Sequence, residues 1–200
     1  MVDDRLTFAL QQQLLEWRAE LATGAERVGW KIGRLVAPEP VVGHLTSATR
    51  LEPGAGFDAA GTTDLRVDVE LAVELGEEAE PAGFAVALEL VDYDRPTDDL
   101  DSVIASNCFH RAFVLSPSRP HLPDSLQARV LVDGEVRGEA IAAYDPASLE
   151  RAAELLEAAG ERLEPGDRVI TGAIVQVPVS PGNEVDVELG DLGRLSVTIT

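Results

Sequence analysis

Basic residues, cysteines and long apolar runs are all scarce in this sequence. Its 200 residues contain 16 Lys and Arg against 36 Asp and Glu, which gives a formal net charge of −20. This balance excludes nucleic acid and anionic membranes as expected partners, because phosphate binding needs a basic surface. The lone cysteine, Cys108, excludes an internal disulfide and indicates a reducing compartment. Cys108 itself is predicted to be a small core residue rather than a nucleophile.

No stretch of the sequence is apolar for long enough to cross a bilayer. The longest, Phe84 to Val91, is short and is interrupted by Glu89. The first residues, MVDDRLTFAL, contain two acids where a signal peptide has basic residues before its apolar run. We therefore expect a cytoplasmic protein that has no membrane partner.

Two segments have the periodicity of amphipathic helices. Apolar residues recur at intervals of three and four between Asp4 and Leu21, and Gly24 ends this pattern. A second helix is predicted after Asp145, with Pro146 at its first position and Gly160 at its end. These are the two principal helices expected.

The remaining sequence is mostly of β type. Asp68 to Leu75 alternates between polar and apolar residues, and Phe84 to Val91 resembles a strand covered on both faces. Asp133-Gly134 lies between two alternating segments and predicts a hairpin. A short helix is expected at residues 100–108, and residues 38–57 are predicted to be a loop with short extended pieces. Further strands are predicted at residues 28–32, 112–115, 167–177, 184–189 and 195–200. We expect one α+β domain over residues 1–200, with the helical segment 1–24 packed on it.

Three carboxylates are candidates for a metal site. Asp68 and Glu70 leave the same face of one strand, about 7 Å apart along the chain. By spacing alone, the commoner arrangement is a strand edge that faces solvent. Glu89 interrupts FAVALELV and is predicted to be buried, so it must be neutralised, paired with an arginine or bound to a metal. If two adjacent antiparallel strands bring the three acids together, their oxygens suit Mg²⁺ or Mn²⁺.

Lys31 is the only lysine in a chain with fifteen arginines, and it lies between Trp30 and Ile32. A desolvated lysine has a lowered pKa and can exchange protons near neutrality, which an arginine cannot do. Lys31 is therefore a candidate catalytic residue, although an ordinary surface lysine remains the alternative. The histidines show no metal-ligand spacing; His44 could face a cleft or be structural.

Seven motifs in order resemble one enzyme family. They are ERVGWKIG, VVGHLT, VDVELAVEL, VALELVD, IASNCFHRAFVL, LVDGEV and the C-terminal GDRVITGAIVQVPVSPGNEVDVELGDLGRLSVTI. Together they are similar to the 2-keto-4-pentenoate hydratases and 4-oxalocrotonate decarboxylases of the fumarylacetoacetate hydrolase superfamily. The resemblance extends from about Leu6 to Thr200.

The resemblance implies a mixed β-sheet roll, a divalent metal and a homo-oligomer, with pairing to a related subunit as an open alternative. The residues that it implies are Lys31 as the catalytic residue, Asp68, Glu70 and Glu89 as metal ligands, and Asn107, Thr171 and Gly172 as substrate-binding residues. We also expect His44 to bind the substrate, at the pocket rim beside Asn107. This sequence also departs from the family. Asp68 replaces a glutamate, Phe109 to Arg111 replace small residues, Ala173 replaces a common serine, and the segment after KIG is short and lacks hydroxyls.

The leading hypothesis is a Mg²⁺- or Mn²⁺-dependent lyase, either a hydratase or a decarboxylase. It would act on a small 2-keto or 2-hydroxydienoic acid through a metal-stabilised enolate. Two alternatives stay open. One is a catalytically degenerate member that serves as a binding or accessory subunit, which the departures motivate. The other is a hydrolase that cleaves a C–C bond of acylpyruvates.

Overall fold

The computed structural model describes residues 4–33 and 40–200 of the chain. Its helices are α1 (Asp4–Ala22), α2 (Leu100–Ala105) and α3 (Ala147–Ala158), with a 3₁₀ turn η1 (Gly190–Leu192). Its strands are β1 (Arg27–Gly33), β2 (Val41–Thr46), β3 (Gly56–Phe57), β4 (Leu65–Leu75), β5 (Pro81–Asp92), β6 (His110–Leu115), β7 (Leu126–Val132), β8 (Glu135–Ala142), β9 (Arg168–Ile170), β10 (Val175–Pro178), β11 (Glu184–Leu189) and β12 (Gly193–Ile199). The predicted α+β class with two principal helices is confirmed.

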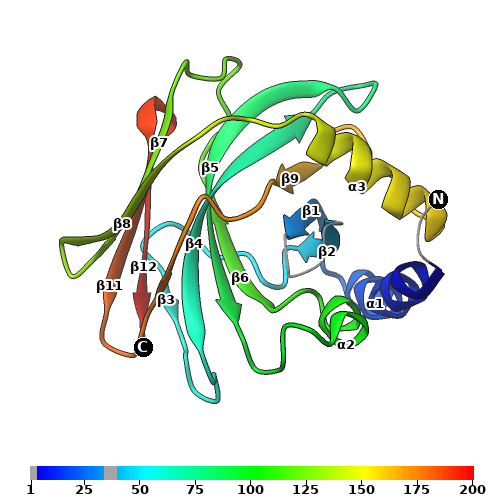
Figure 1. Ribbon diagram of the computed structural model, residues 1–200, viewed down its shortest axis with the longest axis horizontal. Coiled ribbons are helices and arrows are strands. Elements are labelled where there is room, and N and C mark those ends of the chain that lie inside the picture. Colours follow the sequence, from blue (N-terminus) through cyan, green and yellow to red (C-terminus); the bar gives the residue numbers. More distant parts are fainter. Residues whose placement is uncertain (1–3, 34–39) are drawn as a thin grey trace.

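The strands form two sheets, and the helices lie at the end of the molecule away from the smaller sheet (Figure 1). The larger sheet has seven strands in the order β2-β1-β9-β4-β5-β6, with β10 paired to β4. The smaller sheet has the order β3-β12-β11-β7-β8. Strands β1 and β9 are parallel, whereas β4 and β5 are antiparallel, so the larger sheet is mixed.

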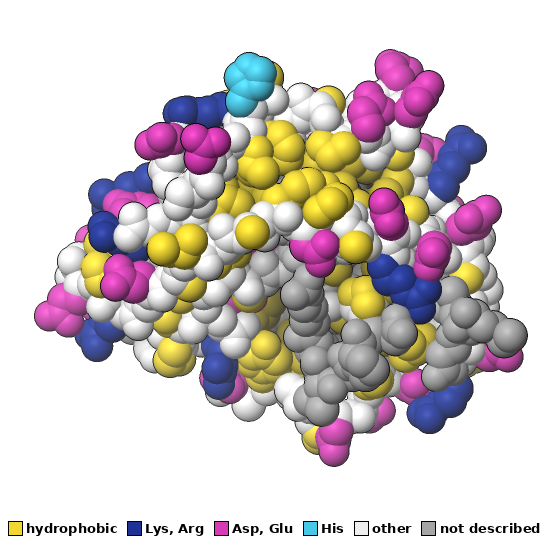
Figure 2. Space-filling model, turned by 45° about the horizontal axis from the view of Figure 1, so that its top comes forward, with side chains coloured by type: hydrophobic (Ala, Val, Ile, Leu, Met, Phe, Trp, Pro, Cys, Tyr) yellow, Lys and Arg dark blue, Asp and Glu magenta, His cyan; other side chains and the backbone are white. Residues whose placement is uncertain are grey.

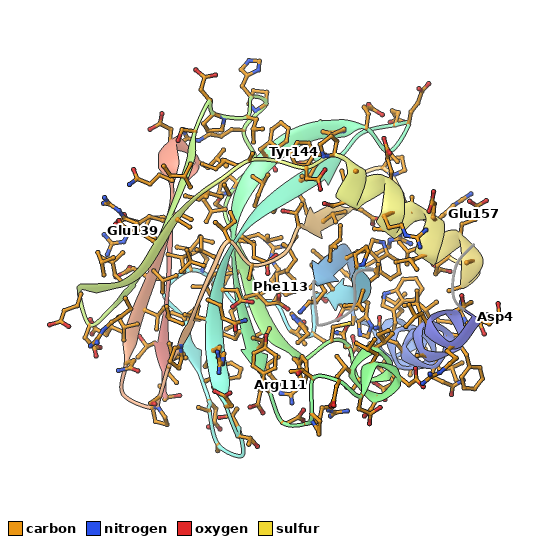
Figure 3. The ribbon with its side chains drawn as sticks, viewed as in Figure 1. Asp4, Arg111, Phe113, Glu139, Tyr144 and Glu157 are labelled. Atoms are coloured by element: carbon orange, nitrogen blue, oxygen red, sulfur yellow. The ribbon has the colours of Figure 1, made fainter. Side chains whose placement is uncertain are left out.

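The larger sheet curls into a roll. Arg50, which follows β2 at one edge, forms a β-bridge with Phe113 of β6 at the other edge. The interior side of β4 and β5 carries small residues, Ala72, Ala85 and Ala87, and Phe113 fills the space between them. In Figure 3, Phe113 lies inside the molecule, whereas Glu139 and Glu157 project at its periphery. Small side chains let the strands curve closely around an enclosed space.

Strand β4 separates two environments, because its successive side chains point to opposite faces. Val67, Val69 and Leu71 belong to the main hydrophobic core, which also includes residues of the smaller sheet. Asp68 and Glu70 point to the opposite face, inside the roll. Both faces of β4 are buried, and this burial excludes the arrangement in which the two acids edge a solvent-facing strand.

Helix α1 covers the outside of the roll near β2 and α2. Its buried positions include Leu10, Leu14 and Trp17, which follow the predicted periodicity. The ring of Trp17 lies 5.4 Å from that of Trp30 on β1. Trp30 thus faces outward to α1, and Lys31, the next residue along the strand, points inward. None of the helices in the described part of the chain is long and apolar enough to cross a membrane.

Local turn chemistry follows the sequence at the β7–β8 hairpin. Asp133 and Gly134 have φ angles of +54° and +78°, as a two-residue hairpin turn of type I′ requires.

Acidic side chains are spread over the visible surface and interspersed with arginines rather than gathered in one patch (Figure 2). This distribution is typical of a solvated acidic surface.

Two sequence-based expectations need correction. The strand predicted over 167–177 is two strands, β9 and β10, which pair with different parts of β4. The break includes Gly172 at φ +105°, a conformation that ends the extended run. The stretch predicted as loop contains β2, a six-residue strand that is buried throughout. Residues 38 and 39 of that stretch lie outside the described residues.

Candidate metal and active site

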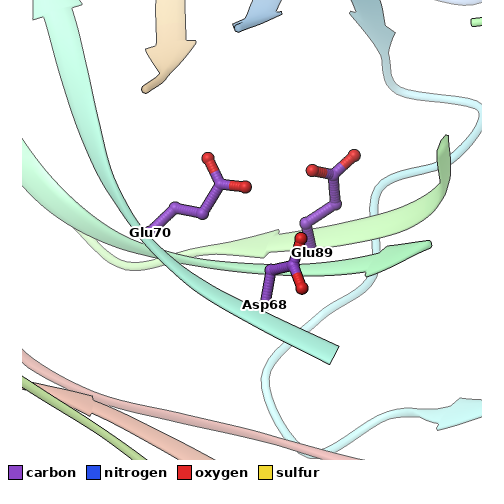
Figure 4. Close-up of side chains that lie close together, drawn as sticks. All are labelled: Asp68, Glu70 and Glu89. Atoms are coloured by element: carbon purple, nitrogen blue, oxygen red, sulfur yellow. The ribbon is translucent and has the colours of Figure 1, made fainter. Parts of the chain in front are cut away.

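The three predicted acids meet inside the roll. Asp68 on β4 lies directly opposite Glu89 on β5 in the antiparallel ladder, and Glu70 follows two residues along β4. Their side chains leave the two strands on the same side, and their carboxylates face a common space (Figure 4). One carboxylate oxygen from each lies within 4.8 Å of the others, and the three residues are only 1–4% exposed. The sequence prediction that adjacent antiparallel strands bring these acids together is confirmed.

Protein donors hold one oxygen of Asp68 and one of Glu70. The Gln176 side chain on β10 donates from Nε2 to Asp68 Oδ2 at 3.2 Å. The backbone N–H of Gly172 donates to Glu70 Oε2 at 2.7 Å. Gly172 reaches Glu70 because the chain bends between β9 and β10. The break in the predicted strand therefore orients a carboxylate.

Glu89 Oε1 is bound from two directions. The Lys31 ammonium contacts it from β1, and His110 Nδ1 lies 2.7 Å away on β6. Among the described residues no arginine contacts Glu89, so of the alternatives left open for it the arginine salt bridge is not observed, and Lys31 and His110 are its partners instead. Strands β9 and β4 lie between β1 and β5 in the sheet, which means that the Lys31–Glu89 contact crosses the interior of the roll.

The second oxygen of each acid is available to a ligand. Asp68 Oδ1 is fully buried and has no hydrogen-bond partner among the residues that the structure describes, which is costly unless something else satisfies it. In the described part of the chain no donor binds Glu70 Oε1 or Glu89 Oε2. When all three carboxylates are ionised, they and the one ammonium leave two negative charges, which a divalent cation would balance.

A divalent cation therefore fits this group of residues. Carboxylate oxygens are the ligands that Mg²⁺ and Mn²⁺ prefer. Mg–O distances of about 2.1 Å require ligand oxygens roughly 3 to 4 Å apart. The separations of up to 4.8 Å need only small side-chain movements to reach that range. Asp68 is shorter than the family's usual glutamate, but it still belongs to the cluster.

The pKa values of the three acids shift in two directions: those of Asp68 and Glu70 are raised, whereas that of Glu89 is lowered. Burial, with added repulsion from Glu89, raises the pKa of Asp68 to about 7. Burial and the neighbouring acids raise the pKa of Glu70 well above its usual value. Burial acts in the same direction on Glu89, but Lys31 and His110 outweigh it and lower its pKa. Without a cation, Glu89 is the carboxylate most easily ionised.

Lys31 is buried, as predicted, but its protonation differs from the prediction. Desolvation alone would lower its pKa; the charge and hydrogen bond of Glu89, with further contributions from Cys108 and Glu70, together outweigh it and raise the pKa above the ordinary value. The expectation of a lowered pKa is therefore wrong for this arrangement. Nζ also donates to the carbonyl oxygen of Cys108 at 3.1 Å. Two of the three N–H donors are thus engaged, and the third has no partner within residues 4–33 and 40–200, which leaves it for a substrate.

An unusual turn supplies that carbonyl. Asn107, Cys108 and Phe109 all have φ angles between +54° and +66°, a conformation that costs energy for residues with side chains. The Asn107 amide secures the turn to β2, because it accepts from the backbone N–H of His44 at 2.8 Å and donates to the His44 carbonyl at 3.0 Å. The turn places Cys108 and His110 beside the acids. Cys108 is a buried core residue, and burial raises the pKa of its thiol to about 12.

The four predicted substrate-binding residues separate into two pairs. Thr171 and Gly172 line the cavity above the acids. His44 and Asn107 are not among its lining residues. The ring of His44 points toward α1, with Nδ1 3.3 Å from Gln13 Oε1. The observed contacts of Asn107 are those that secure β2.

The cavity has a volume of about 380 Å³ and a mixed lining. Lys31 and the three acids form its polar end, and Asp145 and Ser148 add further polar residues to the lining. Its other walls include Val91, Tyr93, Phe109 and Leu126. Such a space can take a small organic acid with its polar groups toward Lys31 and its carbon chain toward the apolar wall.

Sequence reasoning missed two residues of this site. Gln176, which orients Asp68, is a polar residue in the apolar run Ile174 to Val179. That signal is the same one that marked Glu89, so Gln176 could have been found. His110 contacts Glu89 only because β6 pairs with β5, and no local pattern indicates the contact.

The comparisons with known proteins agree with this fold. The model of the family described as fumarylacetoacetate (FAA) hydrolase C-terminal matches residues 31–200. The chain belongs to the fumarylacetoacetate hydrolase family. The superfamily predicted from the sequence motifs is confirmed, whereas a search of the curated proteins gave no match.

Several solved structures share this fumarylacetoacetate hydrolase fold. A 4-oxalocrotonate decarboxylase from Pseudomonas putida G7, complexed with magnesium and adipate, has a TM-score of 0.87 at 21% identity, covering 98% of this chain and 86% of its own. A 5-carboxymethyl-2-hydroxymuconate delta-isomerase from Mycobacterium smegmatis has a TM-score of 0.69 at 20% identity, and the match covers 88% of this chain and 78% of the isomerase. A fumarylpyruvate hydrolase from Pseudomonas aeruginosa, in complex with Mn²⁺ and pyruvate, has a TM-score of 0.62 at 18% identity. The match covers 88% of this chain and 90% of the hydrolase. At these identities the likeness concerns the fold, and the three proteins carry out different reactions.

Metal binding should release protons, because the cation must displace them from Asp68 and Glu70. With the pKa of Asp68 at about 7, the affinity for Mn²⁺ should rise as the pH increases through 7. Isothermal titration in two buffers of different ionisation enthalpy counts the released protons. The number should be larger at pH 6 than at pH 8.

A matched pair of variants tests the location of this binding. Glu70→Gln should abolish it, whereas Glu74→Gln should leave it unchanged, because Glu74 lies on the same face of β4 but pairs with Arg168 at 3.0 Å. An affinity for Mn²⁺ that does not vary with pH, or that survives Glu70→Gln, would contradict this site.

Proposed function

We propose that this protein is a divalent-metal-dependent lyase that acts on a small 2-keto or 2-hydroxydienoic acid, as a hydratase or a decarboxylase. The observation that carries the proposal is the convergence of three buried carboxylates and one ammonium at the polar end of one cavity. Family membership supports a metal-dependent enzyme. The finer assignment depends on the chemistry that these side chains can perform.

Asp68, Glu70 and Glu89 would hold the cation, with Mg²⁺ or Mn²⁺ suited to their oxygens. When bound, such a cation supplies Lewis-acid stabilisation to the enolate of a 2-keto acid. Gln176 and Gly172 keep the carboxylates of Asp68 and Glu70 oriented through their hydrogen bonds. These donors fix the ligands before any substrate arrives, which lowers the cost of assembling the site.

Lys31 binds the substrate or moves a proton. Its raised pKa keeps it protonated at neutral pH, so its free N–H can donate to a substrate carboxylate or to a carbon that gains negative charge. Hydration of a dienoate and decarboxylation of a keto diacid both pass through an enolate. The same ammonium can serve either reaction.

The cavity walls favour a small substrate with an apolar portion. Val91, Phe109 and Leu126 contribute apolar side chains to the lining, and Lys31 beside them is only 4% exposed. Exclusion of water strengthens the interaction of Lys31 with a bound carboxylate. We propose that Thr171 and Gly172, which line the cavity, contact the substrate, and that His44 and Asn107 support it indirectly by fixing β2 and the turn before β6.

A hydrolase of acylpyruvates is less well supported. Such a reaction needs a base that activates a water, and among the described residues no histidine lines the cavity. Both ring nitrogens of His110 are engaged, by Glu89 and by Thr49. The degenerate alternative is also weakened, because the short Asp68 still reaches the cluster. The segment after KIG, which lacks the usual hydroxyls, lies largely outside the described residues.

Metal-dependent turnover tests the proposal directly. Purified protein with Mg²⁺ should consume oxaloacetate or a 2-hydroxydienoate, followed by ultraviolet absorbance, and EDTA should stop the reaction. Consumption of an acylpyruvate instead would favour the hydrolase alternative. Glu70→Gln should be inactive, and Glu74→Gln should keep the wild-type rate. Tight Mn²⁺ binding without turnover of any of these substrates would favour the accessory-subunit alternative.

Lys31→Arg should lower kcat by about 100-fold or more if the ammonium transfers a proton in the reaction. A guanidinium keeps the charge but does not give up its proton. Arg194→Lys, at an exposed pair with Asp186 in the smaller sheet, is the control for exchanging the two cations. Thermal unfolding should show that both variants fold. A near-normal rate for Lys31→Arg would reduce Lys31 to a fixed charge.

We also propose that the chain forms a homo-oligomer, as its resemblance to the family predicts. Phe8 and Leu15 on α1 are 64% and 57% exposed, which leaves apolar surface for a neighbouring copy. Light scattering should give a mass that is a multiple of 21.3 kDa. A stable particle of 21.3 kDa would contradict this, unless a related second chain completes the assembly.

A further inference from the structure

His110 occupies a position between the candidate metal site and the surface. It begins β6, opposite Val91 of β5. Its Nδ1 lies 2.7 Å from Glu89 Oε1, and its Nε2 lies 2.9 Å from the hydroxyl of Thr49. Its side chain is 1% exposed, but it does not line the cavity. The predicted function gave this residue no role.

The two contacts determine which ring nitrogen carries the proton. An ionised Glu89 only accepts hydrogen bonds, so Nδ1 must be the donor. In the neutral ring Nε2 is then an acceptor, and the Thr49 hydroxyl donates to it. Thr49 in turn is held by its backbone carbonyl, which accepts from the N–H of Phe113 at 3.0 Å. The two hydrogen bonds that link Thr49, His110 and Glu89 therefore form a series that is fixed at both ends.

This series of hydrogen bonds fixes the orientation of the Glu89 carboxylate. His110 and Lys31 both bind Oε1 of Glu89, from β6 and from β1. Two donors on one oxygen prevent the carboxylate from rotating, and Oε2 stays directed at the space shared with Asp68 and Glu70. Lys31 alone would hold Glu89 less firmly, because its long side chain has several rotatable bonds.

We propose that His110, oriented by Thr49, is a positioning residue that presents Glu89 Oε2 to the divalent cation. The inference rests on the proposed metal site. It assigns a role to a buried histidine that contacts one of the three acids. His110 has no contact with the cavity, so its effect on a substrate is exerted only through Glu89.

The experiment compares Mn²⁺ dissociation constants, measured by the loss of the free-ion signal in electron paramagnetic resonance. His110→Ala should weaken binding by about 10- to 100-fold, as for other partners of metal ligands. His110→Asn should recover part of this loss, because its amide can donate to Glu89 in place of Nδ1. The recovery would distinguish hydrogen bonding from the filling of space.

Thr49 supplies an independent arm that leaves the histidine in place. Thr49→Val removes the hydroxyl at nearly constant volume and should weaken Mn²⁺ binding, whereas Thr49→Ser should not. The double variant His110→Ala/Thr49→Val should bind no more weakly than His110→Ala, because Thr49 acts through His110. Thr62→Val is the matched control, since the Thr62 hydroxyl donates to Ala59 O at 2.8 Å, remote from the acids.

The outcomes separate this inference from the proposed function. Wild-type affinity in His110→Ala, or in Thr49→Val if His110→Ala does not fold, would overturn the positioning role while leaving the metal site in place. A wild-type protein that binds no Mn²⁺ would overturn the metal site itself, and this inference with it. If His110→Ala does not fold, the comparison of His110→Asn with Thr49→Val and Thr49→Ser still decides.

Discussion

The contact between the Lys31 ammonium and the Glu89 carboxylate crosses the interior of the rolled sheet, and the site is organised around it. Burial of either charge alone would be strongly unfavourable, since each depends on the other for compensation. The pair joins β1 to β5, two strands that are not neighbours in the sheet. Its formation therefore requires that the sheet curl, and its presence identifies the enclosed side as polar.

The neighbouring groups extend this arrangement in a consistent way. Because Glu89 is compensated by Lys31 and His110, it remains ionised, while Asp68 and Glu70 carry raised pKa values. One oxygen of each acid is held by a protein donor and the other is left for a ligand. The three acids are thus arranged so that their remaining oxygens can hold a divalent cation.

Much of this could be predicted from local sequence, for identifiable reasons. Alternation along β4 placed Asp68 and Glu70 on one face, because side-chain direction in a strand has a period of two. Glu89 was recognisable because a charge inside an apolar run must be compensated. The helix α1 and the β7–β8 hairpin followed from periodicity and turn chemistry.

The errors occurred where contacts join segments distant in sequence. The pKa of Lys31 was predicted from its apolar neighbours along the chain, but Glu89, 58 residues away, reverses the shift. Local propensity would continue the strand through Gly172, but the chain bends there. The bend allows the backbone N–H of Gly172 to donate a hydrogen bond to Glu70. His44 was expected at a cleft, yet its ring points to Gln13 on α1.

By itself, the sequence determined which residues carry charge, which faces of the strands are apolar, and the family to which the motifs belong. These properties depend on side-chain chemistry and on periods of two or 3.6 residues, which the chain specifies locally. Only the tertiary structure decided which acids share one space, which donor holds each oxygen, and whether Lys31 keeps its proton. Such properties depend on distances and desolvation, and these exist only once the sheet has closed.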